Sequence, residues 1–255
     1  KLFSKHSLPD ATIFEGGNDF SFLISDGKAL QLVQDSKNLW QGTLSGDEVL
    51  EIRFNPLQKQ FWILGKKSLH VLNPSSKSLN KVFDGSNFTS FDLTQNNKAV
   101  IIGTTNGYIK FDPATKKQVG NIQQKLPVTH ITSVKEINGK VWFGSTDGVF
   151  SLRSDGKFDY YNGERWLPGD RVKQISEGPN HSVLALTNAG LGQIAFKEMT
   201  LEQKALFLEE QVRQRHIRNG FNSTVVGMEK GNLSTGFMED SDNDGLWTAM
   251  YLGGE

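Results

Sequence analysis

The chain has 255 residues and a mass of 28.4 kDa, which is enough to bury a sizeable core in one large domain or two small ones. Its 28 Lys and Arg balance 28 Asp and Glu, so no net charge draws it to nucleic acid or to an anionic membrane. Because it has no Cys, disulfides, thiolate catalysis and cysteine-ligated metals are excluded. No apolar run is long enough to span a bilayer, so we expect no membrane insertion.

A repeat of about 40 residues runs through most of the chain. The clearest copies are 99–113 and 140–152, in which Gly103 and Gly144 occupy the same place. Each copy contains short apolar runs separated by a turn, Asn106-Gly107 in one and Asp147-Gly148 in the other. These dipeptides tolerate the positive φ angles of tight hairpin turns. The pattern therefore predicts antiparallel strands joined by hairpins.

Four short strands per repeat is the spacing of a β-propeller blade. The sequence predicts an all-β propeller of about five four-stranded blades, followed by a C-terminal α-helix and a mostly irregular tail. The fifth blade lacks an outer strand, and we expect residues 1–8 to supply it and to close the ring. In the third blade we expect an outer strand at 119–122. The predicted blades are 12–46, 47–85, 86–127, 128–169 and 170–198.

Neighbouring apolar residues in the repeat are predicted to pack the blades against one another, because a single sheet cannot cover both of its own faces. The pairs concerned are Trp62/Ile63, Ile101/Ile102 and Trp142/Phe143.

The runs at 142–149 and 102–107 resemble the two-component-regulator propeller repeat. That repeat occurs in sensor domains of hybrid kinases and in assorted extracellular proteins, and the resemblance covers about residues 20–198. It implies a propeller fold and an extracellular or periplasmic location. The repeat recurs across unrelated functions, so it indicates a fold and not an activity.

A helix is predicted at about 200–218, where apolar residues recur at helical spacing. Thr200 and Gln203 form a capping box at its start, and Glu209 and Arg213 form an i, i+4 pair. Gly220 is expected to end it. We therefore divide the chain into a propeller at 1–198 and a tail at 199–255.

An acidic loop follows, in which Asp240, Asp242 and Asp244 alternate before Gly245. Alternating oxygens of this kind can converge on Ca²⁺, but an EF-hand needs a Glu where this chain has Tyr251. The loop is consistent with three roles. It caps a helix that begins near Leu246, it binds Ca²⁺, or it is a catalytic or sugar-binding acidic loop.

The segment 242–252 is similar to the entry of an (α/α)-toroid domain, which follows propellers in some carbohydrate-related extracellular proteins. The similarity implies that Asp242 and Asp244 could serve glycan chemistry, with most of such a toroid lying outside this chain. Residues 199–255 would then begin a further domain or serve as a docking segment for a further domain or chain. Because the chain also begins at Lys1 without Met, we expect it to be a piece of a longer polypeptide.

Other motifs give weaker indications. The five His residues have no metal-ligand spacing, and the run 65–68 is explained better by a hairpin than by a phosphate loop. Four sequons mark possible glycosylation of an extracellular protein, at Asn87, Asn180, Asn222 and Asn232. Aromatic residues near strand ends or loops could stack on a sugar ring, although packing explains them too; these are Trp40, Tyr160, Tyr161 and Trp166.

Three functional hypotheses follow. The first is an extracellular recognition or scaffold module that binds a glycan or a protein without catalysis of its own. The second is the propeller portion of a carbohydrate-active enzyme whose helical catalytic domain follows residue 255. The third is a structural subunit of an extracellular assembly. None requires a cofactor other than the Ca²⁺ considered above.

Overall fold

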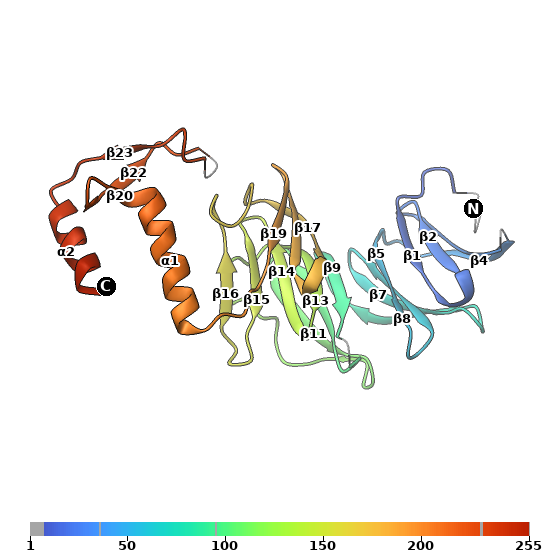
Figure 1. The fold of residues 1–255 in the computed structure, drawn as a ribbon. Coiled ribbons are helices and arrows are strands. Elements are labelled where there is room, and N and C mark those ends of the chain that lie inside the picture. Colours follow the sequence, from blue (N-terminus) through green and yellow to red (C-terminus); the bar gives the residue numbers. More distant parts are fainter. Residues whose placement is uncertain (1–7, 36, 95, 230–231, 255) are drawn as a thin grey trace. The chain divides into compact units, whose positions relative to one another are not determined.

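The computed structural model describes residues 8–35, 37–94, 96–229 and 232–254. Contacts divide the chain into two compact units, Lys1–Ile194 and Ala195–Glu255. The first unit consists of antiparallel sheets that follow one another in chain order, from blue to orange in Figure 1. The second unit contains both long helices.

In the described part of the first unit, four sheets have four strands and a fifth has three, each with its strands in sequence order. We call these sheets blades 1 to 5, and this arrangement confirms the predicted propeller blades. Blade 1 is β1 (Ile13–Gly16), β2 (Phe22–Ser25), β3 (Ala29–Gln34) and β4 (Lys37–Thr43). Blade 2 is β5 (Val49–Asn55), β6 (Gln60–Gly65), β7 (Ser68–Asn73) and β8 (Ser78–Asp84).

The remaining blades follow the same order. Blade 3 is β9 (Phe88–Leu93), β10 (Val100–Thr104), β11 (Gly107–Asp112) and β12 (Lys117–Gln118). Blade 4 is β13 (Ile131–Ile137), β14 (Lys140–Ser145), β15 (Val149–Leu152) and β16 (Phe158–Tyr161). Blade 5 is β17 (Val172–Glu177), β18 (Val183–Thr187) and β19 (Leu191–Ile194).

Two sequence predictions about outer strands have different outcomes. The strand expected at 119–122 is wrong, because β12 ends at Gln118 and Gly120 has a positive φ of 70° that breaks the extended backbone. All of the ring-closing strand expected from residues 1–8 except Leu8 lies outside the described residues.

The blades pack through alternate side chains. Along β6, Phe61 and Ile63 lie in a core shared with blade 1, whereas Trp62 and Leu64 lie in a core shared with blade 3. Successive residues of a strand point to opposite faces, so one strand supplies both interfaces. The predicted packing pairs of blades 3 and 4 behave in the same way, with Ile102 and Phe143 facing the preceding blade and Ile101 and Trp142 facing the next.

The first strands of all five blades line one central cavity of about 600 Å³. A side chain on each of several inner strands accepts a hydrogen bond from the backbone of the next inner strand. We call these bonds the inner-strand ladder. They run from Phe54 N to Glu15 Oε1 (3.3 Å), from Phe91 N to Glu51 Oε2 (2.8 Å), from Val134 N to Ser90 Oγ (3.0 Å) and from Ile175 N to Ser133 Oγ (3.0 Å).

The second unit begins with α1 (Leu201–His216). The expected capping box is present, because Thr200 Oγ1 accepts from Gln203 N (3.1 Å) and Gln203 Oε1 accepts from Thr200 N (3.0 Å). The Glu209–Arg213 ion pair also forms, at 2.5 Å. The helix ends at His216 and not at 218, because Asn219 and Gly220 have positive φ and turn a short hairpin, β20 (Ile217–Arg218) with β21 (Phe221–Asn222).

The tail contains more regular structure than the sequence predicts. A second hairpin joins β22 (Thr224–Val226) to β23 (Phe237–Glu239), and α2 spans Asp244–Gly254. Thr248 packs into this unit, where its Oγ1 accepts a hydrogen bond from Asn222 N at 3.0 Å. No residue of α1 is buried within the part of the chain that the structure describes.

Candidate functional site

Strand order places two kinds of connection at the same end of each four-stranded blade. In an antiparallel sheet ordered 1-2-3-4, the hairpin between strands 2 and 3 and the link from strand 4 to the next blade leave from one end. Backbone hydrogen bonds join these connections, as from Lys66 N to Glu48 O (3.1 Å) and from Thr146 N to His130 O (3.2 Å). We call this end of the first unit the link face.

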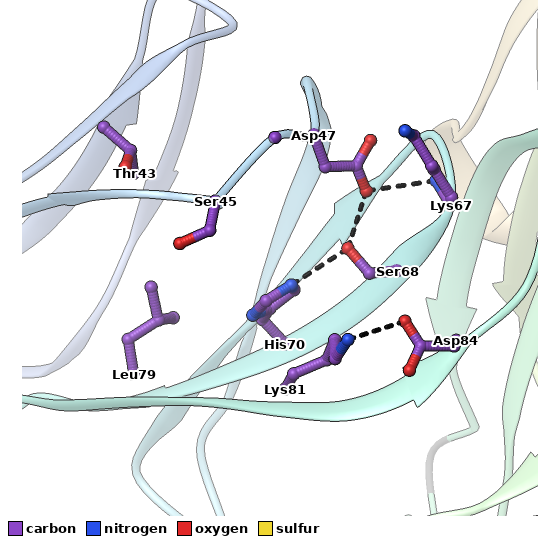
Figure 2. Close-up of a pocket in the computed structure, with 10 residues that line it drawn as sticks. Thr43, Ser45, Asp47, Lys67, Ser68, His70, Leu79, Lys81 and Asp84 are labelled. Atoms are coloured by element: carbon purple, nitrogen blue, oxygen red, sulfur yellow. Dashed lines mark hydrogen bonds and ion pairs between the residues drawn. The ribbon is translucent and has the colours of Figure 1, made fainter.

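The link face contains a polar cleft of about 430 Å³ at the junction of blades 1 and 2. Figure 2 shows its walls, which come from the end of β4, the link from β4 to β5, the hairpin between β6 and β7, and β8. The residues that line it are Thr43, Ser45, Gly46, Asp47, Lys67, Ser68, His70, Leu79, Lys81 and Asp84.

A chain of hydrogen bonds crosses the cleft from Asp47 to His70. The Asp47 carboxylate accepts from Ser68 Oγ at 2.6 Å and from Lys67 N at 3.1 Å, and its other oxygen accepts from Glu48 N at 2.9 Å. Burial opposes ionisation of Asp47, but these hydrogen bonds outweigh it and hold the pKa of the carboxyl below its usual value. Asp47 is therefore an anion near neutral pH.

The hydroxyl proton of Ser68 determines which nitrogen of the His70 ring carries a proton. Ser68 has one hydroxyl proton and gives it to Asp47, so its bond to His70 Nε2, at 2.9 Å, requires that Nε2 carries a proton. Burial is the main reason that the pKa of His70 lies below its usual value, which makes the ring neutral near pH 7. Nδ1 is then an unprotonated acceptor.

This arrangement differs from a catalytic triad in the direction of its hydrogen bonds. In a triad, the imidazole accepts the serine proton and the carboxylate orients the imidazole. Here Ser68 donates directly to the carboxylate, and the ring donates to Ser68. Ser68 is thus held as a hydrogen-bonded hydroxyl and is not activated as a nucleophile, so the cleft is suited to binding.

A second polar cluster lies on the inner strands. The Glu51 carboxylate pairs with Arg53 and accepts from Ser90 Oγ at 2.8 Å, and Asp92 lies between Arg53 and Lys135, whose Nζ is 3.2 Å away. Burial raises the pKa of Glu51, and Arg53 opposes that rise. Because each charge has an opposite partner on the same or the next strand, we assign this cluster to inter-blade packing.

Two of the four aromatic residues predicted to bind a ligand, Tyr161 and Trp166, are in contact on blade 4, whereas the adjacent Tyr160 points to the other face of β16. The Tyr161 and Trp166 rings meet edge to face at 5.1 Å, and Tyr160 donates from its hydroxyl to Asp147 O at 2.6 Å. They lie at the end of β16 and in the link to blade 5, which places them on the link face. Trp40 is apart from them, on β4, where it packs against the core of blades 1 and 2.

The acidic residues of the second unit form no metal cluster in the described residues. Asp244 accepts hydrogen bonds from Ser241 Oγ (2.8 Å) and Ser223 Oγ (3.2 Å), which hold the pKa of its carboxyl below the usual value. Asp244 is the first residue of α2, which begins before the expected Leu246, and both the capping role and Ca²⁺ at Asp240, Asp242 and Asp244 stay predictions. Of the sequons, Asn87, Asn180 and Asn232 are exposed and Asn222 is half-buried.

The sequence analysis missed Asp47, Ser68 and His70. It noted only that His70 and the other histidines lack metal-ligand spacing, and it interpreted the run containing Ser68 as an ordinary hairpin. The available signal was a departure from the repeat, because blades 3 and 4 turn with Asn106-Gly107 and Asp147-Gly148, whereas blade 2 has Lys66-Lys67-Ser68. A polar substitution at one copy of a structural turn can mark a local function.

Comparison with known proteins shows the fold. No family model and no curated protein matches the chain. The extracellular domain of a hybrid two-component system protein from B. thetaiotaomicron matches with a TM-score of 0.61 and 14% identity over 77% of this chain. Virginiamycin B lyase from Staphylococcus aureus matches with a TM-score of 0.58 and 12% identity, covering 74% of this chain and 72% of the lyase.

A further match is the WD40 β-propeller domain of Doa1, with a TM-score of 0.58, 10% identity, and coverage of 72% of this chain and 63% of the domain. The chain spans only 29% of the B. thetaiotaomicron extracellular domain. These identities support the propeller fold alone. No helix among the described residues is long and apolar enough to cross a membrane.

Proposed function

We propose that the chain is an extracellular or periplasmic recognition module that binds a glycan or a protein on the link face without catalysing a reaction. The observation that carries the proposal is the cleft between blades 1 and 2. It is lined by paired donors and acceptors, and the hydrogen-bond direction at Ser68 suits binding better than nucleophilic attack. The likeness in fold to extracellular domains of two-component systems is consistent with a sensing or binding role.

The aromatic group of blade 4 is a second part of the proposed binding face. The Trp166 side chain is 43% exposed, and its ring is held against Tyr161. An exposed indole that is held in place can stack on a sugar ring or on a side chain of a partner protein. Arg165 lies over the same indole, 5.3 Å from the ring centre, and adds a donor group at this place.

The experiment uses the full 255-residue chain on an array of immobilised glycans and of peptides. We expect saturable binding to at least one class, weakened by Asp47→Asn and unchanged by Asp155→Asn, an exposed aspartate outside the link-face cleft. If Trp166→Ala weakens the binding, the aromatic group belongs to the binding site. The absence of binding to every glycan and peptide would contradict the proposal.

A further inference from the structure

The cleft itself points to one kind of ligand. We infer that it binds a neutral, hydroxyl-bearing molecule of the size of a small saccharide or polyol, and that His70 Nδ1 accepts a hydrogen bond from one of its hydroxyls. This inference rests on the proposed function and assigns the site and the chemistry of its ligand. Its four supports are an unpaired ring nitrogen, a balance of charge, an apolar wall and a suitable volume.

The first support is the unpaired nitrogen of His70. The residue is 9% exposed, and Nδ1 is buried without a hydrogen-bond partner among the described residues. Figure 2 shows this nitrogen on the side of the ring turned away from Ser68, toward the part of the cleft that Ser45 and Leu79 line. A buried acceptor without a donor is unfavourable, so a ligand that brings a hydroxyl proton to this atom is stabilised there.

The second support is the charge around the ring. The ionisable residues that line the cleft with His70 are two acids, Asp47 and Asp84, and two bases, Lys67 and Lys81. Lys81 Nζ lies 2.9 Å from Asp84 Oδ1, and Asp47 accepts three hydrogen bonds. Because the cations and anions balance, the cleft has no excess charge to attract an ionic ligand, and a neutral ligand loses less hydration on entry.

The third and fourth supports are shape and surface. A volume of about 430 Å³ lies in the range of small-molecule sites. Leu79 provides an apolar wall for C–H groups, while the hydroxyls of Thr43 and Ser45 can both donate and accept. A molecule with apolar C–H faces and several hydroxyls matches this combination, whereas an extended peptide needs a longer groove.

Nuclear magnetic resonance of the full chain with ¹⁵N-labelled histidine tests the inference at the atom concerned. The probes are glucose, galactose, mannose, N-acetylglucosamine, maltose and glycerol, each titrated at pH 7.5, with sodium phosphate and arginine as ionic controls. We expect at least one neutral probe to shift the His70 Nδ1 resonance saturably. The Nδ1 resonance of His181, which is exposed at the end of blade 5 opposite the link face, should not shift. A shift caused only by the ionic controls, or by no probe, overturns the inference.

Two substitutions of His70 distinguish the effect of losing the hydrogen-bond acceptor from the effect of losing the ring. His70→Asn places an amide oxygen near the position of Nδ1, whereas His70→Phe keeps a ring and removes the acceptor. For the probe that binds best, we expect His70→Phe to weaken binding by about tenfold or more and His70→Asn to retain most of it. His181→Phe is the matched control, and circular dichroism with urea unfolding shows whether each variant is folded.

The outcomes of the two proposals can be told apart. If the chain binds a saccharide on the array but a folded His70→Phe binds it equally well, the inference about His70 is wrong and the proposed recognition function remains. If neither glycans nor peptides bind on the array and no probe shifts the His70 resonance, both are wrong.

Discussion

Residues that look alike in the repeat have different roles in different blades. Gly103 and Gly144 are required by close packing, because a Cβ at either position would lie 2.6 Å from a methyl group of the next blade, on Ile131 or Val172. At Gly65 the equivalent space is taken instead by the carboxylate of Asp47. The same small residue thus serves packing in two blades and makes room for the cleft in blade 2.

We expect Gly144→Ala to destabilise the first unit by about 1–3 kcal/mol, the usual cost of overpacking a core. The added methyl would meet Val172 at the interface of blades 4 and 5. Urea unfolding followed by tryptophan fluorescence measures the effect. Gly16→Ala is the control, because its nearest neighbour, Phe22, is at an ordinary contact distance of 3.8 Å, and equal losses for both variants would contradict the packing explanation.

His70 also makes stability depend on pH. Its pKa in the folded chain is below the usual 6.5, chiefly because of burial, with Lys81 acting in the same direction and Asp47 and Asp84 opposing it. As the pH falls below about 6.5, His70 binds a proton in the unfolded chain but stays neutral in the folded chain. The free energy of unfolding therefore decreases. Asp47 acts in a lower window, because its folded pKa is below 3.8 and its contribution is lost as the pH falls through that value.

The prediction is that wild-type protein loses more stability between pH 7.5 and pH 5.5 than His70→Phe does. Urea midpoints at the two pH values give the comparison, and the other histidines are common to both proteins. Equal losses in the two proteins would show that His70 takes up its proton as readily in the folded chain as in the unfolded one.

At the scale of elements, hydrogen bonds between inner strands complement the apolar packing. Ser133 is 5% exposed, and its Oγ accepts from Ile175 N at 3.0 Å, which joins β13 of blade 4 to β17 of blade 5. An amide at this place has no neighbouring strand of its own sheet on that side, because the inner strand is the sheet edge. The ladder therefore satisfies edge amides that would otherwise face the cavity.

Ser133→Ala is expected to cost about 1–3 kcal/mol, since it leaves a buried N–H without an acceptor. Hydrogen exchange of the Ile175 amide should become faster in the same variant. Ser154→Ala, at an exposed turn in blade 4, is the matched control and is expected to change neither quantity. Unchanged exchange at Ile175 in the Ser133 variant would contradict the role assigned to the ladder.

The sequence predicted those elements whose signals are local. Asn-Gly and Asp-Gly turns located the hairpins of blades 3 and 4, and the capping box located the start of α1. It failed after β12, where the positive φ of Gly120 interrupts the strand expected at 119–122, and at Gly220, which turns a hairpin instead of ending the helix. Such outcomes depend on which backbone groups pair across space, and apolar spacing does not record that.

The candidate site could not be predicted for a related reason. Asp47 and His70 are 23 residues apart, and nothing in either segment indicates the other until Ser68 brings them together on the link face. The aromatic group was easier to predict from the sequence, because Tyr160, Tyr161 and Trp166 are close in sequence. Trp40 was grouped with them as an aromatic residue near a strand end, but it lies in the middle of β4 and packs, half-buried, against the core of blades 1 and 2.

At the scale of the whole molecule, the chain combines a propeller unit with a smaller helical unit. Propellers are stable supports that present many loops at one end, so function is decided by the side chains on those loops. In this chain the link face carries both the cleft and the aromatic group. If the link face is a recognition surface, a ligand must contact the chain there.

Hydrogen–deuterium exchange of the full chain, with and without the best-binding saccharide of the probe set, tests that claim most directly. We predict that the ligand slows exchange in the link at 43–48 and the hairpin at 65–70, on both sides of the cleft. The two hairpins at the opposite end of blade 2, at 55–60 and 73–78, should not change. Protection at those two hairpins or in residues 195–254, with none at the cleft, would contradict the account.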